Sequence, residues 1–569
     1  MISWKQWLMG CIICILLVIS MMPVEPRWAE ADVVLSKLLP WMCLTMIMIC
    51  VLRIGYMEFK AQDWAIVIWG IYYLGRLWIG AEYPCATEFL KTVCILVLYF
   101  VLRVLFDFWR PSSRWIVMVI IVFGIYEAGY GTWQLLMSSS RNFRYPLTGS
   151  FFNPGPYSAS LMIAAVCCIS WYIEARNRKM RKYLVLCIGL LGMLLPATMS
   201  RAAFAAMGFA TFLLFRKKLS RMGLIGKIAL CIGLLGAGLG LYFIKQGSAD
   251  GRLLMWMASL TSWWNQPWIG VGIGGFHNAS AEGMKFLYEK MQDCNLFSSG
   301  GVADYACNDM VLILTEQGLI GTMLCGYVVF LCLWEMYKQC KPLFYGFLSL
   351  LIFSLFSYPF EMLPYRIITV IVMAWISSNN DHDMVQINRY GWAICMAVLG
   401  GLSFFVENQI DVRNKADKAA AQLSGIHHDA FIKDYYELLS MELDNPQYLF
   451  DFAKTLNESH RFNDSNDMLR RGIQVSADPM FYVVMGNNYR DMKMYGQAET
   501  AYRMAYATMP NRLYPLYQLM KLYETMGDTA QLRIMAEKVL DFKEKIPSPA
   551  TREMKMDGES IFHKIKKKQ

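Results

Sequence analysis

The chain has 569 residues, 56% of them hydrophobic and only 17% charged, and its mean hydropathy is +0.33. This composition excludes a soluble protein of this size and predicts a polytopic membrane protein. The net charge of +10 lies mostly in short loops between apolar runs, so we expect no nucleic-acid partner.

Apolar runs with the length of membrane spans recur through residues 1–406. A helix is the only open-ended structure that satisfies its own backbone in hydrocarbon, and about 20 residues are enough to cross it. We therefore predict an all-α bundle of about 12–13 spans over this region. The candidate spans are 7–22, 33–54, 63–81, 90–108, 114–137, 158–175, 183–199, 202–215, 224–244, 309–335, 343–357, 364–378 and 389–406.

Basic residues gather in alternate loops between these spans. If the N-terminus is cytoplasmic, the inside loops carry Arg110, Arg114, Arg176, Arg178, Lys179, Arg181, Lys182, Arg216, Lys217, Lys218, Arg221, Lys227, Lys338 and Lys341. Cytoplasmic loops of membrane proteins carry such an excess of Lys and Arg. The bias predicts that the large loop at 245–307 and the C-terminal tail both face away from the cytoplasm.

Five arginines lie at span ends on the predicted outer side, against this bias: Arg141, Arg144, Arg201, Arg252 and Arg366. Each one alone is compatible with an interfacial anchor whose charge reaches the lipid headgroups. A guanidinium is also suited to the paired oxygens of phosphate, because it is always charged and presents two donors. Their gathering on one side indicates an anionic lipid-linked substrate, most simply a pyrophosphate headgroup.

A turn signal precedes the span at 158–175. The run Asn153, Pro154, Gly155, Pro156 predicts a turn that leads into a helix. The first backbone N–H groups of a helix that begins there would face outward and offer an anion site beside Arg141 and Arg144. Asn153 is therefore a candidate substrate-binding residue, with an ordinary helix start as the alternative.

The large loop contains a glycine run, Gly270, Gly272, Gly274 and Gly275. We exclude a dinucleotide-binding loop, because no strand precedes the run and cytosolic nucleotides are absent from the predicted outer side. We expect the glycines to let the backbone turn back toward the membrane. Trp263, Trp264 and Trp268 are expected to lie at the interface or to stack on a sugar.

After Phe405 the composition becomes charged and amphipathic, and a period of roughly 33 residues appears. The clearest copy begins at Pro479 and carries Gly486, Tyr489, Ala498, Tyr502, Ala505 and Pro510 at the spacing of a tetratricopeptide helix pair. We therefore predict a tetratricopeptide-like α-solenoid over 411–545, followed by a basic tail at 546–569. The solenoid either grips a protein partner or an acceptor on its concave face, or is a solvated cap.

Together these motifs resemble those of the O-antigen ligase and O-antigen polymerase superfamily of bacterial membrane glycosyltransferases. The likeness covers about 148–335, and some members also carry a tetratricopeptide tail. It consists of an F-x-N-P segment (151–154), an S-R turn (Ser200, Arg201), an outer loop that opens with Arg252 before P-x-x-G-x-G (267–272), and a segment similar to H-N-x-x-L-x-x-x-x-E-x-G-x-x-G (307–321).

The resemblance implies transfer of a glycan from an undecaprenyl-pyrophosphate carrier to a glycan, lipid A-core or protein acceptor. The reaction would take place at the periplasmic face of the bacterial inner membrane, in the assembly of lipopolysaccharide or another surface polysaccharide, and would need no metal or other cofactor. In that scheme Arg201 and Arg252 hold the pyrophosphate and neutralise charge as it leaves. Such preorganised stabilisation is usually the largest catalytic term.

The general base is where the chain departs from the family's pattern. Ligases have a His before the conserved Asn, whereas this chain has Cys307, and a thiol is a poor base for a sugar hydroxyl. Candidate bases are His277, whose side chain has a suitable unperturbed pKa of about 6.5, and Asp304, Asp309 and Glu316. Asp309 is equally suited to cap the helix that begins there. Asn308, Glu316 and Arg366 are further candidates for substrate binding.

Four alternatives remain open at this point. A polymerase and a protein O-oligosaccharyltransferase share the scaffold and differ in the acceptor. A flippase of lipid-linked glycans would need charges deep within several spans, whereas here Arg and Lys cluster at span ends. An inactive assembly scaffold stays open because of Cys307.

Overall fold

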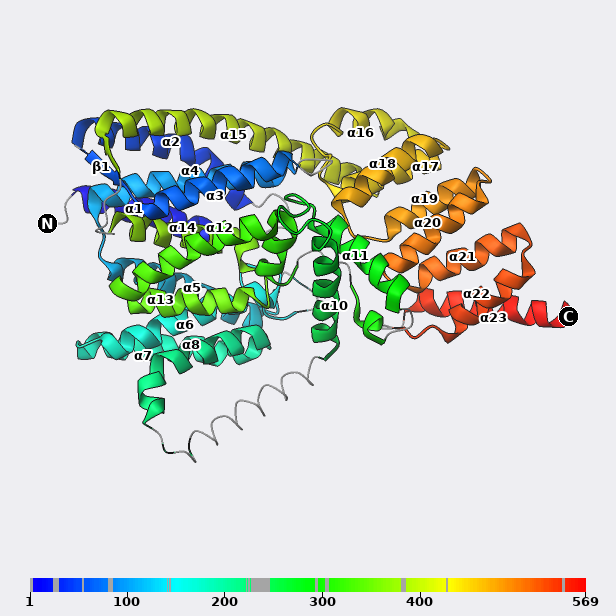
Figure 1. Cartoon of the computed structure of the whole chain (residues 1–569), viewed down its shortest axis with the longest axis horizontal. Coiled ribbons are helices and arrows are strands. Elements are labelled where there is room, and N and C mark those ends of the chain that lie inside the picture. Colours follow the sequence, from blue (N-terminus) through cyan, green and yellow to red (C-terminus); the bar gives the residue numbers. More distant parts are fainter. Residues whose placement is uncertain are drawn as a thin grey trace.

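The described part of the chain is almost wholly α-helical, as predicted (Figure 1). The computed structural model describes residues 4–23, 30–53, 56–79, 85–140, 142, 145–221, 223, 226, 246–291, 295–301, 306–379, 385–425, 428–544 and 548–568. Within these ranges there are 22 α-helices and one pair of short strands, which the sequence did not indicate.

Most helices in the first three quarters of the chain form a bundle, on the left of Figure 1. Its described members are α1 (Trp4–Met21), α2 (Glu30–Arg53), α3 (Ala61–Trp78), α4 (Ala86–Trp109), α5 (Ser113–Met137), α6 (Pro154–Glu174), α7 (Arg178–Leu194), α8 (Arg201–Ser220), α12 (Asp309–Gln339), α13 (Lys341–Ser354), α14 (Leu363–Ser378) and α15 (Arg389–Leu423). Each coincides with a predicted span, while most of the candidate span at 224–244 lies outside the described residues.

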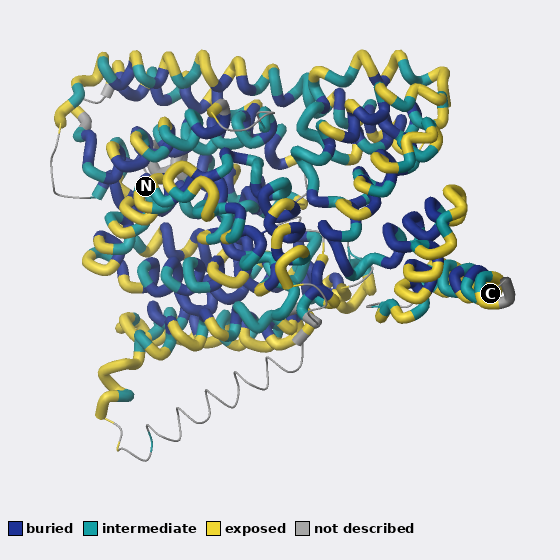
Figure 2. The backbone as a smooth tube through the Cα atoms, turned by 45° about the vertical axis from the view of Figure 1, so that its right-hand side comes forward, coloured by how far each residue is buried: buried dark blue, intermediate teal, exposed yellow. Residues whose placement is uncertain are grey.

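The bundle has the lengths and the exterior of a membrane domain. Among the described residues, seven helices are long and apolar enough to cross a membrane, and three shorter helices are also apolar. Helix α6 is central, since 83% of its apolar stretch is buried, whereas the corresponding share for α7 is 17%. Large apolar side chains such as Leu186 and Met193 on α7 are exposed, and Figure 2 shows exposed positions along the outer helices. Lipid is the solvent that suits this surface.

The two ends of the bundle differ. At one end, β1 (Tyr56–Phe59) pairs antiparallel with β2 (Val385–Asn388). Helices α4, α12 and α14 end nearby, because Trp375 donates to Pro111 O (2.7 Å) and Gln339 donates to Asn379 O (3.3 Å). At the opposite end, α10 (Gln246–Trp263) and α11 (Phe276–Met291) lie between the bundle and the C-terminal helices (Figure 1). We call these the β1/β2 end and the α10/α11 end.

The basic loop residues follow this division. Arg110 caps the C-terminus of α4, Lys338 lies in the last turn of α12, and Lys341 begins α13. All three therefore belong to the β1/β2 end, which corresponds to the predicted cytoplasmic side. Which end faces the cytoplasm stays a prediction.

A buried ion cluster joins three helices near the β1/β2 end. Arg103 on α4 and Asp63 on α3 are both fully buried and lie 3.3 Å apart. Arg103 also donates to Ser377 on α14 (3.2 Å), and Ser377 donates to Asp63 (2.8 Å). A buried charge is tolerated only when it is paired in this way. The cluster sets the relative positions of α3, α4 and α14, whose other ends frame the site described below.

Helix α15 runs without interruption from the bundle into the C-terminal part of the chain. Its 35 residues correspond to about 52 Å at 1.5 Å per residue. The change from apolar to charged composition at Phe405 therefore falls inside one helix, and no Gly or Pro follows it before Leu423. The predicted boundary between spans and tail is a change of surroundings along a continuous helix.

The remaining helices form the C-terminal array, on the right of Figure 1. They are α16 (Ile432–Leu438), α17 (Pro446–Glu458), α18 (Phe462–Val475), α19 (Met480–Asp491), α20 (Tyr495–Thr508), α21 (Leu513–Met526), α22 (Thr529–Asp541) and α23 (Pro549–Lys568). Each packs on its neighbours in sequence. Gly486 on α19 allows Tyr502 on α20 to approach, because a Cβ there would lie 2.5 Å from the ring. The predicted basic tail forms α23, while the tetratricopeptide assignment stays a prediction.

Candidate active site

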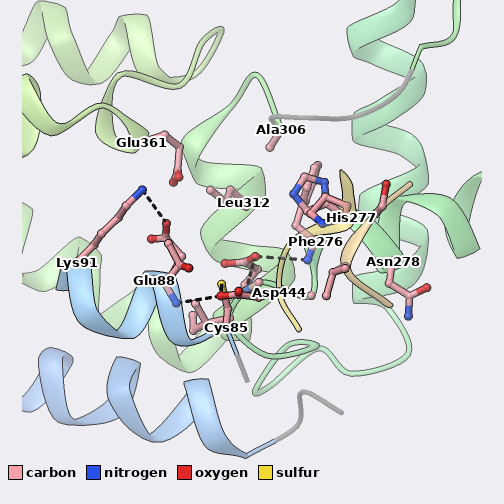
Figure 3. A pocket seen from close by; sticks show the side chains of 18 of the residues that line it. Cys85, Glu88, Lys91, Phe276, His277, Asn278, Ala306, Leu312, Glu361 and Asp444 are labelled. Atoms are coloured by element: carbon pink, nitrogen blue, oxygen red, sulfur yellow. Dashed lines mark hydrogen bonds and ion pairs between the residues drawn. The ribbon is translucent and has the colours of Figure 1, made fainter. Parts of the chain in front are cut away.

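A cavity of about 760 Å³ lies where the bundle, the α10–α11 segment and the C-terminal array meet. Its volume is in the range of small-molecule sites. In Figure 3, Glu88, Lys91 and Glu361 lie on one side, and His277 and Asn278 lie on the other. The cavity is bounded by α4 and α14, by the loop before α11, and by two loops of the array.

The loop between α10 and α11 pairs with a break in helix α12. Gly318, with φ 65° and ψ −167°, interrupts the helix. The backbone groups freed there bond to the loop: Val271 N donates to Thr315 O (2.9 Å), Gly272 N to Glu316 O (3.0 Å), and Leu319 N to Pro267 O (2.9 Å). Buried backbone groups need such partners. The loop is therefore a structural complement of α12.

Close backbone approach explains two of the glycines. A Cβ on Gly270 would lie 2.5 Å from the carbonyl carbon of Glu316, and a Cβ on Gly318 would lie 2.4 Å from Trp268 O. Both residues also have positive φ, a conformation that favours glycine. The glycine run turns the loop onto the backbone of α12, while the expected turn toward the membrane stays a prediction.

Glu316 holds the start of α11 against the cavity. Its Oε1 accepts hydrogen bonds from Gly274 N (2.9 Å) and Phe276 N (3.3 Å). The next residue, His277, is half-buried and lines the cavity, with its ring edge-on to Phe276 at a centroid distance of 5.8 Å. Glu316, expected to bind substrate, thus has a structural role at this loop and also lines the cavity.

The cavity wall carries more carboxylates than cations. The acidic residues are Asp32, Glu88, Glu282, Glu316, Glu361 and Asp444, and the basic ones are Lys91 and Arg366. Lys91 Nζ lies 4.0 Å from Glu88 Oε1. Cations outside the wall pair with two of these acids, Lys285 with Glu282 (2.6 Å) and Arg413 with Asp444 (3.8 Å).

Arg366, expected as an anion receptor, is held by two carboxylates. Its Nη2 lies 3.4 Å from an oxygen of Glu88 and 3.4 Å from one of Glu361. Its Nε donates to Phe360 O (2.6 Å). Burial raises the pKa of Glu361, and the Arg366 guanidinium opposes that shift. The guanidinium therefore ties α14 to α4.

Arg201 and Arg252 come together at the α10/α11 end. Arg201 is the first residue of α8, after Ser200, whose hydroxyl accepts from Ala203 N (3.4 Å). Arg252 lies on α10 and donates to Phe356 O (2.5 Å). Burial, and then the positive charge of Arg252, lowers the pKa of the Arg201 guanidinium. The fold thus places the two guanidinium groups within electrostatic reach of each other.

The expected site residues at helix starts act as caps or are buried. Asn153 Oδ1 accepts from Gly155 N (2.8 Å), and Asn308 Oδ1 accepts from Met310 N (3.0 Å). Asn308, rather than Asp309, is the cap of α12. Asp309 is buried, accepts from Phe360 N (3.4 Å) through Oδ2, and does not line the cavity. Arg141, Arg144 and Asp304 lie outside the described residues.

Several cavity residues were missed from the sequence. Glu88 and Lys91 form an i, i+3 pair at the start of a span. Charged residues within membrane spans are often part of a functional site. Glu361 lies shortly before Arg366, but the position at a span end indicated only the arginine as a candidate. Nothing local marks Asp444, because its place at the cavity depends on how the array docks.

The array docks through side chains on three surfaces. Asp444 accepts from Thr87 N (3.0 Å) in the first turn of α4, whose N-cap residue, Cys85, makes no side-chain capping bond to the helix. The other contacts join Asn278 to Gln474 (2.8 Å), Lys285 to the Tyr482 hydroxyl (2.6 Å), and Asn511 to Gly300 O (2.7 Å). Lys285 is almost fully buried. The docked position is therefore specific.

The substitution Asp444→Ala tests this docking. We expect it to expose the N-terminus of α4 and to destabilise the docked state by about 1–2 kcal/mol, as for loss of a helix cap. Hydrogen exchange of the full-length protein in nanodiscs should be faster in the first turn of α4. Asp434→Ala, an exposed acid of the array, is the matched control. Unchanged hydrogen exchange in α4 would contradict the role of Asp444 in docking the array.

Neither a scan against protein-family models nor a search of curated proteins finds a match for this chain. Among the described residues, no group of three or more His, Cys, Asp and Glu side chains is placed to hold a metal ion. The expectation of a reaction without a metal or other cofactor stays a prediction.

Proposed function

We propose that this protein is a membrane glycosyltransferase of the O-antigen ligase and polymerase type. It transfers a glycan from an undecaprenyl-pyrophosphate donor to an acceptor at the periplasmic face of the bacterial inner membrane. In this assignment the α10/α11 end and the array, as a tetratricopeptide-like solenoid, lie on the periplasmic side. The motif order from 148 to 335 supports the family, and the bundle supports the membrane location.

The placement of Arg201 within electrostatic reach of Arg252 is the observation that carries the proposal. They come from α8 and from α10, which are separate in sequence, and they approach closely enough for one charge to affect the other. A diphosphate accepts paired hydrogen bonds from guanidinium groups, and two of them near each other suit its two phosphates. In the transition state the same groups stabilise the charge that develops on the leaving diphosphate.

The bond changes place two demands on the site. An acceptor hydroxyl oxygen forms a bond to the anomeric carbon, and the bond from that carbon to the phosphate oxygen breaks. The hydroxyl proton passes to a base, and the undecaprenyl diphosphate leaves with the electron pair. The arginines serve the leaving group, so the acceptor and its base belong on the cavity side.

His277 is the base that the geometry favours. Met255, one helical turn after Arg252 on α10, packs against the cluster of Phe276 and Ala306. The residue after Phe276 is His277, which lines the cavity. His277 thus lies at the cavity, in a segment that packs against α10, the helix that carries Arg252. Glu316 supports this role by holding the Phe276 backbone.

His277→Gln should lower the transfer rate by about 10²-fold or more, the usual contribution of a general base. An imidazole acts as a base only when neutral, so the fall in kcat/KM at acidic pH should also disappear in the variant. The measurement is glycan transfer by the purified protein across a pH series. His563→Gln on α23, an exposed histidine near Glu559, is the control. A wild-type pH profile in the His277 variant would remove this residue from the mechanism.

The direct test of the function uses purified protein in nanodiscs with an undecaprenyl-pyrophosphate-linked oligosaccharide. Release of undecaprenyl pyrophosphate together with glycan on an added acceptor would support a transferase. Movement of intact donor across a bilayer without release would indicate a flippase. If the protein shows neither activity, the inactive assembly scaffold remains as the alternative. The acceptor that becomes labelled distinguishes ligase, polymerase and protein glycosylation.

A further inference from the structure

The array supplies part of the wall of the acidic cavity. Two of its loops line the cavity: 444–446, which leads into α17, and 474–477, which ends α18. The first bonds to the N-terminus of α4, and the second bonds to Asn278. Because both loops are held by bundle or α11 groups, the cavity is incomplete without the array.

The rest of the wall has the composition of a sugar site. The amide and hydroxyl side chains that line it include Asn265, Gln266, Asn278, Gln474 and Ser476. Tyr73, Phe152 and Phe276 supply apolar or aromatic surface in the same cavity. A sugar ring needs many hydrogen-bonding groups for its hydroxyls and an apolar surface for its C–H face.

The charge of the wall restricts which glycan fits. Six acidic side chains and two cations line the cavity, and both cations lie near Glu88. The cations are thus engaged by the wall itself. Two of the acids also pair with cations behind the wall, Glu282 with Lys285 (2.6 Å) and Asp444 with Arg413 (3.8 Å). A glycan that carries uronic acids would bring further negative charge next to the acids of the wall that remain, such as Glu88 and Glu361, and be repelled. An uncharged glycan meets no such penalty, and amino groups on a glycan would be attracted.

We infer that this cavity is the acceptor subsite of the proposed transferase, that the array forms one of its walls, and that it takes a glycan without acidic groups. That the bound glycan is the acceptor rests on the proposed function. It assigns the array to substrate recognition. The donor diphosphate binds separately, at Arg201 and Arg252.

Binding of three tetrasaccharides to the full-length protein in nanodiscs tests the charge selection. The probes are chitotetraose, which is uncharged, its fully de-N-acetylated form, which is cationic, and tetragalacturonate, which is anionic. Titration by saturation-transfer NMR should give at least tenfold weaker binding for tetragalacturonate than for the other two. Equal or tighter binding of the anionic probe, or no binding of the other two at millimolar concentration, would overturn the inference.

A blocking substitution tests the role of the array. Ser476, at the C-cap of α18, lines the cavity, and Ser476→Trp should fill part of it and weaken binding of chitotetraose at least tenfold. Ser459→Trp changes the C-cap residue of α17, which is not part of the lining, and should leave binding unchanged. Equal binding by the Ser476 variant and the wild type would exclude the array from the subsite.

Donor cleavage separates failure of this inference from failure of the proposed function. Release of undecaprenyl pyrophosphate in the absence of acceptor is a hydrolysis, in which water attacks the anomeric carbon and the diphosphate leaves with the electron pair, and in the proposed function it depends on the arginines. If that release depends on Arg252 while Ser476→Trp leaves probe binding unchanged, only the acceptor subsite is wrong. If no release occurs with any donor, the transferase assignment is wrong, whatever the cavity binds.

Discussion

Arg252→Ala is expected to lower release of undecaprenyl pyrophosphate from a lipid-linked donor by about 10²–10³-fold, the effect of removing one preorganised donor from a developing anion. Two guanidinium groups share the diphosphate in the proposed site, and Arg201 alone provides only part of the charge. In cells, the variant should fail to assemble surface glycan while the protein level stays the same. The side chain bonds to Phe356 O, so a modest loss of stability is expected alongside.

Two further variants make the Arg252 result specific. Arg252→Lys keeps the charge and loses the planar pair of donors, so it should recover part of the activity. Arg221→Ala removes an exposed arginine at the other end of α8 and should leave the rate unchanged. If Arg252→Ala matches the wild type in donor cleavage, or if Arg221→Ala is equally inactive, the diphosphate site is not at these arginines.

Gly318→Ala is expected to have the largest effect on the fold. The residue sits at φ 65° and ψ −167°, where an L side chain is strained, and its Cβ would lie 2.4 Å from Trp268 O. Strain and overlap together should cost roughly 3 kcal/mol or more. The loop 267–272 would separate from α12, and the start of α11 would lose its position at the cavity. Thermal unfolding of the purified protein in detergent measures the loss.

Gly326→Ala is the matched control on the same helix. A Cβ there meets nothing within 4 Å, and alanine is favoured over glycine in a helix interior by about 0.5–1 kcal/mol. The control should therefore be as stable as the wild type or slightly more stable. Equal stability of both alanine variants would contradict the role assigned to the break in α12.

The sequence predicts those features that depend on neighbouring residues. Each apolar run encodes its own helix, since length and hydropathy decide whether a segment spans hydrocarbon. The start of α6 was readable from Asn153 and Pro154, because a cap and a proline act within one turn. Caps, glycine runs and basic loops belong to the same class. The prediction of an all-α fold with apolar, span-like helices is accordingly confirmed.

The site required information of a different kind. Asp309 and Asn308 are adjacent, and either suits a cap, but only the structure shows that Asn308 takes that role. Arg366 looks like an anion receptor by its position, and its pairing with Glu88 depends on two helices meeting from distant parts of the chain. The charge of a cavity depends on residues that lie far apart in the sequence, so no local pattern predicts it.

By itself the sequence determined that this chain is an array of apolar helices followed by amphipathic ones, with arginines and glycines concentrated between them. Only the tertiary structure decided that Arg201 meets Arg252, that Gly270 and Gly318 let a loop and a broken helix share hydrogen bonds, and that Asp444 closes an acidic cavity. The physical reason is range: helix formation depends on contacts within a few residues, whereas these pairings depend on how the helices pack.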